Sequence, residues 1–142
     1  MPWLWIGGRD AGLKVSATVI LWLAGQRGWQ QHIAETAALI NAHPPTYLST
    51  LQLTLEDAVV DEFLAKQGDG FLFQSDEGVL DEQEHLIKHL RPTKPVIFRS
   101  NHASNCLALA GNLPKDRDRL LSHISAARSQ SELLRPRYMR EL

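Results

Sequence analysis

The strongest constraint on the fold is a strand, a helix and a second strand that follow one another near the start of the chain. Residues 14–21 (KVSATVIL) are rich in β-branched side chains and predict a buried strand. After a glycine-containing loop over residues 22–28, residues 29–42 carry apolar side chains at helical spacing, and Pro44 stops the predicted helix. Residues 46–53 predict the second strand. Together these elements predict a βαβ unit with two parallel strands.

The rest of the chain continues this alternation. A helix is predicted from Thr54, whose hydroxyl forms a capping-box pattern with Asp57. A second helix is predicted over residues 76–89, a third strand over residues 96–98 after a proline, and a last helix over residues 114–128. Strands that alternate with helices predict an α/β fold with a parallel sheet. Because the sequence predicts only three strands, the expected architecture is a slice of a (β/α) barrel with parallel strands and packed helices.

Length and composition place these elements in one domain over residues 1–142, and the polar, basic residues 129–142 predict a loosely held tail. The net charge of −1 gives no reason to expect a nucleic-acid partner. The longest apolar stretch, residues 15–24, is about half of a membrane span, so no membrane partner is expected. Cys106 is the only cysteine, which excludes an internal disulfide and favours a reducing, cytoplasmic location.

Two stretches carry a resemblance to a known family. Residues 11–25 (AGLKVSATVILWLAG) resemble the fifth barrel strand and following loop of radical S-adenosylmethionine (radical SAM) proteins. Residues 96–121 (VIFRSNHASNCLALAGNLPKDRDRLL) are similar to the C-terminal segment of a radical SAM group related to oxygen-independent coproporphyrinogen oxidase. The resemblance implies that this chain is the C-terminal part of a (β/α) barrel. The earlier strands of such a barrel carry a Cys-x3-Cys-x2-Cys loop, which binds a four-iron, four-sulfur cluster that reduces S-adenosylmethionine to a radical.

The same resemblance assigns a cofactor-binding position to the end of the first strand. It implies that Val19, Ile20 and Leu21 lie next to bound S-adenosylmethionine. The family's strand continues Ile-Leu-Gly-Leu-Gly-Gly, and this sequence has Trp22 and Ala24 at two of the glycine positions. Trp22 is expected to fill the adenine position, and the alternative is that its ring stacks on the adenine. One thiol cannot supply the three cysteine ligands of the cluster. The chain alone is therefore expected to hold no cofactor, whereas its parent protein would use both the cluster and S-adenosylmethionine.

A polar loop after the third strand contains the candidate substrate-binding residues. In a barrel, the loops that follow strand carboxyl ends form the active-site mouth. An arginine, a histidine and two asparagines can donate hydrogen bonds to an anionic or carbonyl-bearing ligand. These residues are Arg99, Asn101, His102 and Asn105. The alternative is that their side chains bond to the backbone and fix the loop.

No metal site and no catalytic residues are assigned. His85 and His89 lie four apart on a predicted helix, but a metal would need a third ligand, so the pair indicates a solvated helix face. Cys106 lies next to an apolar residue and reads as a small core side chain. No nucleophile, base and orienting group can be recognised together in the sequence.

The sequence favours a non-catalytic C-terminal fragment of a radical SAM enzyme. Two alternatives stay open: a free-standing protein-interaction or structural domain, natural or engineered, and a small metal-independent enzyme that uses the loop of residues 99–105. A barrel slice leaves a strand edge without a neighbour, here residues 15–21 or 96–98. We therefore expect a homodimer, formed through such an edge or through the tryptophan-rich N-terminus around Trp3 and Trp5.

Overall fold

The computed structural model describes residues 8–140, so Trp3 and Trp5 lie outside the described residues. The described chain forms a four-stranded sheet with the strand order β1-β2-β3-β4. The strands are β1 (Ser16–Leu21), β2 (Tyr47–Gln52), β3 (Val96–Ser100) and β4 (Leu109–Leu113). The first three run parallel, and β4 pairs antiparallel with β3.

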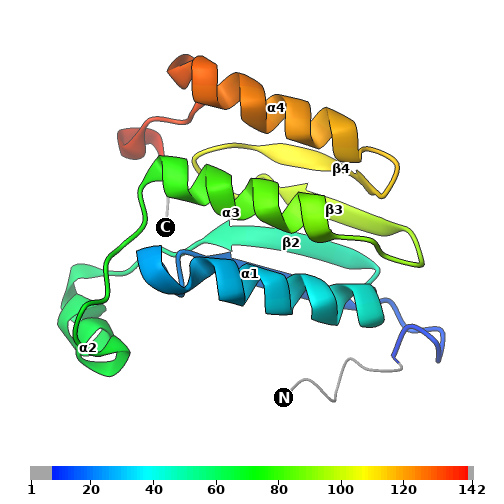
Figure 1. Ribbon diagram of the computed structural model, residues 1–142, viewed down its shortest axis with the longest axis horizontal. Coiled ribbons are helices and arrows are strands. Elements are labelled where there is room, and N and C mark those ends of the chain that lie inside the picture. Colours follow the sequence, from blue (N-terminus) through cyan, green and yellow to red (C-terminus); the bar gives the residue numbers. More distant parts are fainter. Residues whose placement is uncertain (1–7, 141–142) are drawn as a thin grey trace.

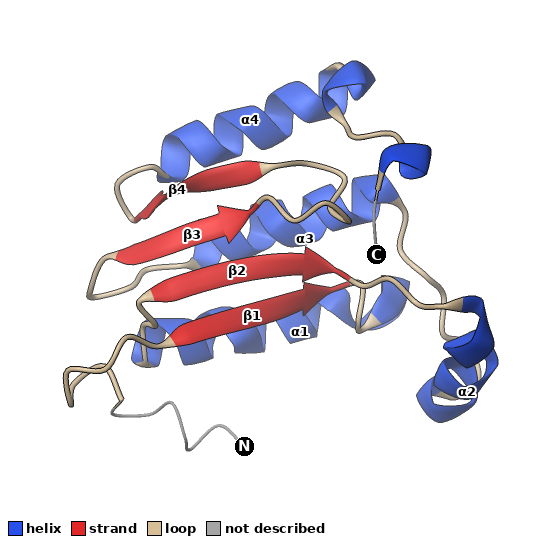
Figure 2. Cartoon of the chain, turned by 180° about the vertical axis from the view of Figure 1, so that it is seen from behind, coloured by secondary structure: helices blue, strands red, loops and turns tan. Residues whose placement is uncertain are grey.

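Helices cover one face of this sheet and leave the other face open (Figures 1 and 2). The covering helices are α1 (Gly25–Ala42), α3 (Asp76–His89) and α4 (Arg117–Ser129). In contrast, α2 (Asp57–Gln67) lies apart, beyond the carboxyl ends of the parallel strands, and has no buried residue. Two short 3-10 turns, η2 (Ser131–Leu133) and η3 (Arg137–Met139), follow α4. The predicted α/β fold with parallel strands and packed helices is confirmed, and the open sheet is consistent with a partial β/α fold.

The core lies between the sheet and the helices because alternate residues of each strand point to that side. On three neighbouring strands Leu21, Leu48 and Phe98 have at most 1% of their surface exposed. Burying a side chain of this size stabilises the fold by about 1.5–3 kcal/mol. The apolar stripe of α1 completes this layer with Ile33, Ala37 and Ile40, all buried. Among residues 8–140, the structure has no helix whose length and apolar character would let it cross a membrane.

The fourth strand is absent from the sequence prediction, which treats its residues as part of a polar loop. In the structure Leu109, Gly111 and Leu113 are buried, and the two residues between them are exposed. Five residues that include a glycine and an asparagine form too weak a pattern to predict a strand. Their antiparallel pairing with β3 is what makes them a strand. Of the two strands expected at an open edge, the one at residues 15–21 is an edge as β1, whereas the one at residues 96–98 is not, because β3 lies between β2 and β4. The other edge of the described sheet is β4.

The starts of several helices also differ from prediction. α1 begins at Gly25, so the expected loop is mostly the first turn of this helix. α2 begins at Asp57 with Glu56 as its N-cap and without a side-chain capping bond, so the predicted capping box with Thr54 is wrong. α4 begins at Arg117, later than predicted. These boundaries depend on local backbone geometry, which periodicity does not specify.

The segment after α4, for which the sequence predicts a loose tail, packs along the protein as far as Arg140. The backbone N–H of Arg135 donates to the carbonyl of Cys106 (2.7 Å), and the Arg135 guanidinium donates to carbonyls of the loop after β3. The Arg140 guanidinium makes two bonds of 2.8 Å to the carboxylate of Asp76 at the start of α3. This tail therefore lies beside the carboxyl ends of the strands (Figure 2).

Candidate functional site

The open face of the sheet carries partly exposed side chains from neighbouring strands. Thr18 and Ser49 are partners in register and share a hydrogen bond of 2.9 Å. The face is hollowed into two adjoining parts of about 280 and 400 Å³. We call this hollow the open-face groove, and its lining includes Thr18, Ile20, Ser49, Leu51, Arg99 and His102. An apolar floor with a few polar groups is typical of a ligand site.

A second hollow of about 390 Å³ opens beyond the carboxyl end of β2. We call it the terminal cleft, and its lining includes Trp22, Leu53, Val60, Phe73, Arg137 and Arg140. Its walls come from the loop after β1, from α2 and from the tail, which are far apart in the sequence. Leu53 and Thr54 border both hollows, so the two adjoin. Because ligands of parallel sheets bind at the carboxyl ends of the strands, the two hollows form the candidate site.

The structure separates the three residues that the resemblance places next to S-adenosylmethionine. Val19 and Leu21 are 7% and 0% exposed and belong to the core between the sheet and the helices. Only Ile20 borders the open-face groove. Three consecutive strand residues cannot share a face, because side chains alternate along a strand. Of these three residues, only Ile20 can therefore contact a ligand in the groove through its side chain.

Three of the candidate substrate-binding residues line the open-face groove: Arg99, Asn101 and His102. The Arg99 guanidinium donates to the carbonyl of Phe98 (2.8 Å), so it is partly used within the sheet. His102 Nδ1 shares a hydrogen bond of 2.8 Å with the hydroxyl of Ser104. This bond fixes the orientation of the imidazole ring at the edge of the groove.

The fourth candidate, Asn105, is 2% exposed and bonds within the fold. β3 pairs with β2 only as far as Ser49, so the last residues of β2 have no strand partner on that side. The Asn105 side chain takes that place: its Oδ1 accepts from the N–H of Gln52 (2.7 Å), and its Nδ2 donates to the carbonyl of Thr50 (2.9 Å). A side-chain amide has the same donor and acceptor as a peptide group. Asn105 therefore extends the hydrogen-bond ladder of the sheet, and it borders neither hollow.

Trp22 has an unusual backbone conformation at the edge of the terminal cleft. Its φ is 75°, in the left-handed region that side chains rarely adopt. Its backbone N–H donates to Oε2 of Glu82 (3.1 Å), and its indole N–H donates to the carbonyl of Ser75 (3.2 Å). Glu82 is fully buried, and this burial raises the pKa of its carboxyl, while the bonds from Trp22 and Gln74 oppose the shift. These bonds fix the loop after β1 against α3.

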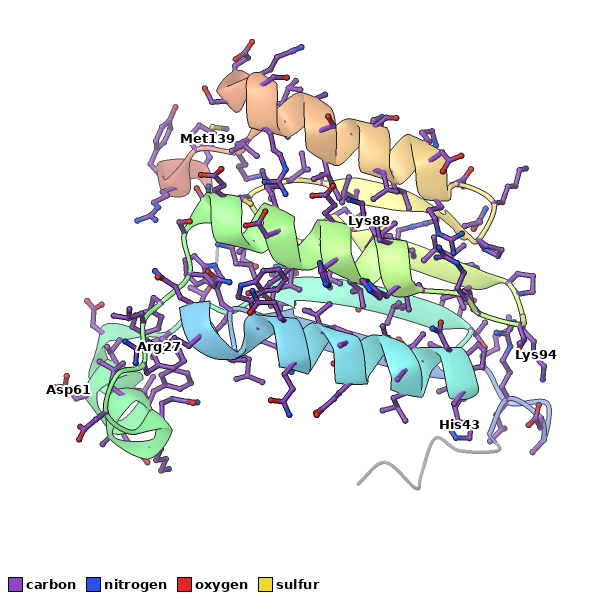
Figure 3. All side chains as sticks on the ribbon, in the orientation of Figure 1. Arg27, His43, Asp61, Lys88, Lys94 and Met139 are labelled. Atoms are coloured by element: carbon purple, nitrogen blue, oxygen red, sulfur yellow. The ribbon has the colours of Figure 1, made fainter. Side chains whose placement is uncertain are left out.

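Aromatic packing holds α2 next to the terminal cleft. The ring of Phe63 meets Phe71 edge-on with 5.3 Å between centroids and stacks on Phe73 at 6.0 Å. Arg27 extends from the first turn of α1 toward the segment after α2 (Figure 3), with its guanidinium close to Gly70. Contacts of this kind place a helix that has no buried residue of its own.

Sequence reasoning missed the residues that α2 and the tail contribute, above all Val60 and Arg137. Val60 belongs to the moderately apolar face of a short helix, and Arg137 lies in a segment expected to be loose. No motif or spacing connects these residues with Trp22, so no signal in a single sequence could have brought them together.

No group of three or more His, Cys, Asp or Glu side chains within residues 8–140 could hold a metal ion. The rings of His85 and His89 stack at 4.5 Å. His85 also meets the edge of Trp29 at 5.3 Å where α1 meets α3, whereas His89 is exposed. Cys106 is 1% exposed, and burial raises the pKa of its thiol to about 11. The thiolate that binds iron or attacks a substrate is therefore strongly disfavoured at neutral pH.

Comparisons of the chain with protein-family models, with curated protein sequences and with solved structures gave no match.

Proposed function

We propose that this chain is the C-terminal part of a radical SAM-type barrel, in which it supplies one wall of the ligand cavity and is not catalytic alone. The observation that carries the proposal is the one-sided covering of its parallel strands (Figure 2). Neighbouring parallel strands such as β1, β2 and β3 are normally covered on both faces, and in a barrel the inner face is covered by side chains from the other strands. A hollowed face lined by Ile20, Leu51 and Arg99 has the character of such an interior.

The backbone of the loop after β1 supports the same proposal. The resembling family has glycines at the positions of Trp22 and Gly25, and both residues have positive φ, 75° and 63°. A Cβ added to Gly25 would lie 2.7 Å from the carbonyl oxygen of Leu72, so this position requires glycine. Trp22 has the backbone conformation that suits the family's glycine, although its side chain differs.

The residues of this chain do not fit the iron–sulfur cluster. The cluster needs three thiolates, whereas the chain has one cysteine, and that thiol is buried with a raised pKa. They also do not fit S-adenosylmethionine in the manner of the family. The indole of Trp22, bonded to the carbonyl of Ser75, occupies a position where the family has only a hydrogen atom. No chemical step is therefore assigned to either group.

A cofactor titration with a restoring variant tests the relationship to the family. We expect anaerobic reconstitution with iron and sulfide to give no stoichiometric cluster, and S-adenosylmethionine to bind with roughly millimolar affinity or weaker. The double variant Trp22→Gly/Ala24→Gly restores the family's glycines and should bind S-adenosylmethionine more tightly in calorimetric titration. A cluster on the wild-type chain, or low-micromolar binding to it, contradicts the proposal. Equal binding by the variant and the wild type contradicts the relationship.

On its own, the chain forms a homodimer through the open face and the edge of β1. Tyr47 on this face is 38% exposed, and Ile20 and Leu51, which pair with each other further along the same strands, are partly exposed. A two-fold axis brings the same patch of both copies together, which covers the apolar side chains and the unpaired strand edge at once. This observation also favours the alternative function of a protein-interaction domain, whose partner is then a second copy of the chain.

Sedimentation equilibrium at about 100 µM, well above the dissociation constants of stable interfaces, tests the dimer. We expect a dimeric wild type and a monomeric Ile20→Lys/Leu51→Lys variant, because lysines in this interface would be buried without partners. The control Leu133→Lys/Met139→Lys changes exposed apolar residues of the tail and should stay dimeric. A monomeric wild type rules out the homodimer.

A further inference from the structure

The terminal cleft differs from the open-face groove in both construction and charge. The open-face groove lies on the strands, whereas α2 and the tail form much of the wall of the terminal cleft. Its apolar lining consists of Trp22, Leu53, Leu55, Val60 and Phe73. Its volume of about 390 Å³ falls within the range of small-molecule sites. The cleft therefore has the size and the apolar surface to hold a small aromatic ligand of two or three rings.

Within residues 8–140, the charged residues that line this cleft are Arg137 and Arg140, and no acidic side chain of this range lines it. The Arg140 guanidinium is bound by both oxygens of Asp76. The hydrogen bonds from Arg140 lower the pKa of this carboxyl, and Arg137 adds a smaller effect through space. Within residues 8–140 the Arg137 guanidinium itself has no hydrogen bond or ion pair. Among residues 8–140, two arginines and one carboxylate leave one positive charge without a paired carboxylate beside an apolar surface.

We propose that the terminal cleft binds a small aromatic monoanion, a carboxylate or a sulfonate. The anionic group pairs with the Arg137 guanidinium, whose planar set of donors matches two acceptor oxygens. The ring system packs on Trp22 and Phe73, since aromatic faces favour stacked or edge-on partners. The hydroxyls of Thr54 and Ser104 add polar contacts at the wall shared with the open-face groove. This site does not depend on the barrel relationship, because the tail and α2 complete it.

Two fluorescent probes that differ in charge test the proposal on the full chain. Anilinonaphthalene sulfonate is an aromatic monoanion, and N-phenylnaphthylamine carries the same rings without the charge. We expect Arg137→Gln to weaken binding of the sulfonate by about tenfold and to leave the neutral probe within about twofold. The control Arg119→Gln removes an exposed arginine of α4 that pairs with Asp116, and neither probe should respond.

Adjacent residues of α2 provide a matched pair that locates the probe. Val60 lines the cleft, whereas Val59 is 42% exposed and does not. Val60→Asp places a negative charge in the cleft wall and should weaken binding of the sulfonate by at least about tenfold, while Val59→Asp should change it by less than about twofold. Circular dichroism and thermal melting check that both variants fold, and Arg137→Gln tests the same site without a change to α2.

Three results would overturn the proposal. The first is the absence of sulfonate binding to the wild-type chain. The second is binding that neither Arg137→Gln nor Val60→Asp affects, because the probe then occupies another surface. The third is an equal loss of the charged and the neutral probe in Arg137→Gln, because the arginine then supports the local structure and does not select an anion.

Discussion

Replacing Asn105 with alanine removes the side chain that completes the hydrogen bonds at the end of β2. In the wild type, its amide satisfies the N–H of Gln52 and the carbonyl of Thr50, and it also donates to the Ser100 hydroxyl (3.1 Å). All of these residues are at most 4% exposed, so water cannot replace the lost partner without opening the core. The substitution therefore leaves two buried backbone groups without a hydrogen-bond partner.

The expected loss of stability follows from the free energy that an unsatisfied buried polar group costs. Each buried donor or acceptor without a partner costs about 1–3 kcal/mol, so two of them lower the free energy of unfolding by about 2–6 kcal/mol. The total stability of a domain of this kind is about 5–15 kcal/mol. Asn105→Ala should therefore lose a large part of the stability of the fold while leaving both hollows unaltered in composition.

Urea unfolding followed by far-ultraviolet circular dichroism measures this loss. We expect a lower midpoint with an unchanged slope, because the unfolded state exposes the same surface. The matched control is Asn101→Ala, which removes the same chemical group from an exposed position and should change stability by less than about 0.5 kcal/mol. A loss below about 1 kcal/mol for Asn105→Ala would refute the assigned role, because even one buried group without a partner costs that much.

Two further predictions concern titratable groups. Burial, together with the neighbouring His89 and Lys88, lowers the pKa of His85 below its usual value of 6.5, so the folded state resists protonation. Stability should therefore fall as pH drops below about 6.5, and His85→Gln should flatten the slope between about pH 7 and pH 5 in urea titrations; an identical slope would contradict this. Cys106, with a pKa raised to about 11, should react slowly with a thiol reagent in the folded chain and rapidly in urea, and rapid labelling of the folded chain would show that it is accessible.

The first βαβ unit follows from the sequence because its signals are local. Within residues 14–21 a run of β-branched side chains selects a strand, and in the helix that follows the spacing of Ile33, Ala37 and Ile40 selects the face that is buried. Both preferences arise from a few neighbouring residues. These local preferences do not depend on the rest of the chain, and they are the basis on which the α/β fold was predicted.

The role of Asn105 and the terminal cleft were decided by the tertiary structure. As a residue type, Asn105 fits a ligand contact as well as a structural one, and only the early end of the β2–β3 pairing makes it a substitute peptide group. In the same way, the weakly patterned residues 109–113 form β4 because they pair with the free edge of β3. Val60 and Arg137 meet Trp22 only because α2 and the tail pack at the same end of the sheet. Contacts between distant segments depend on how the whole chain packs, and a local pattern does not encode that information.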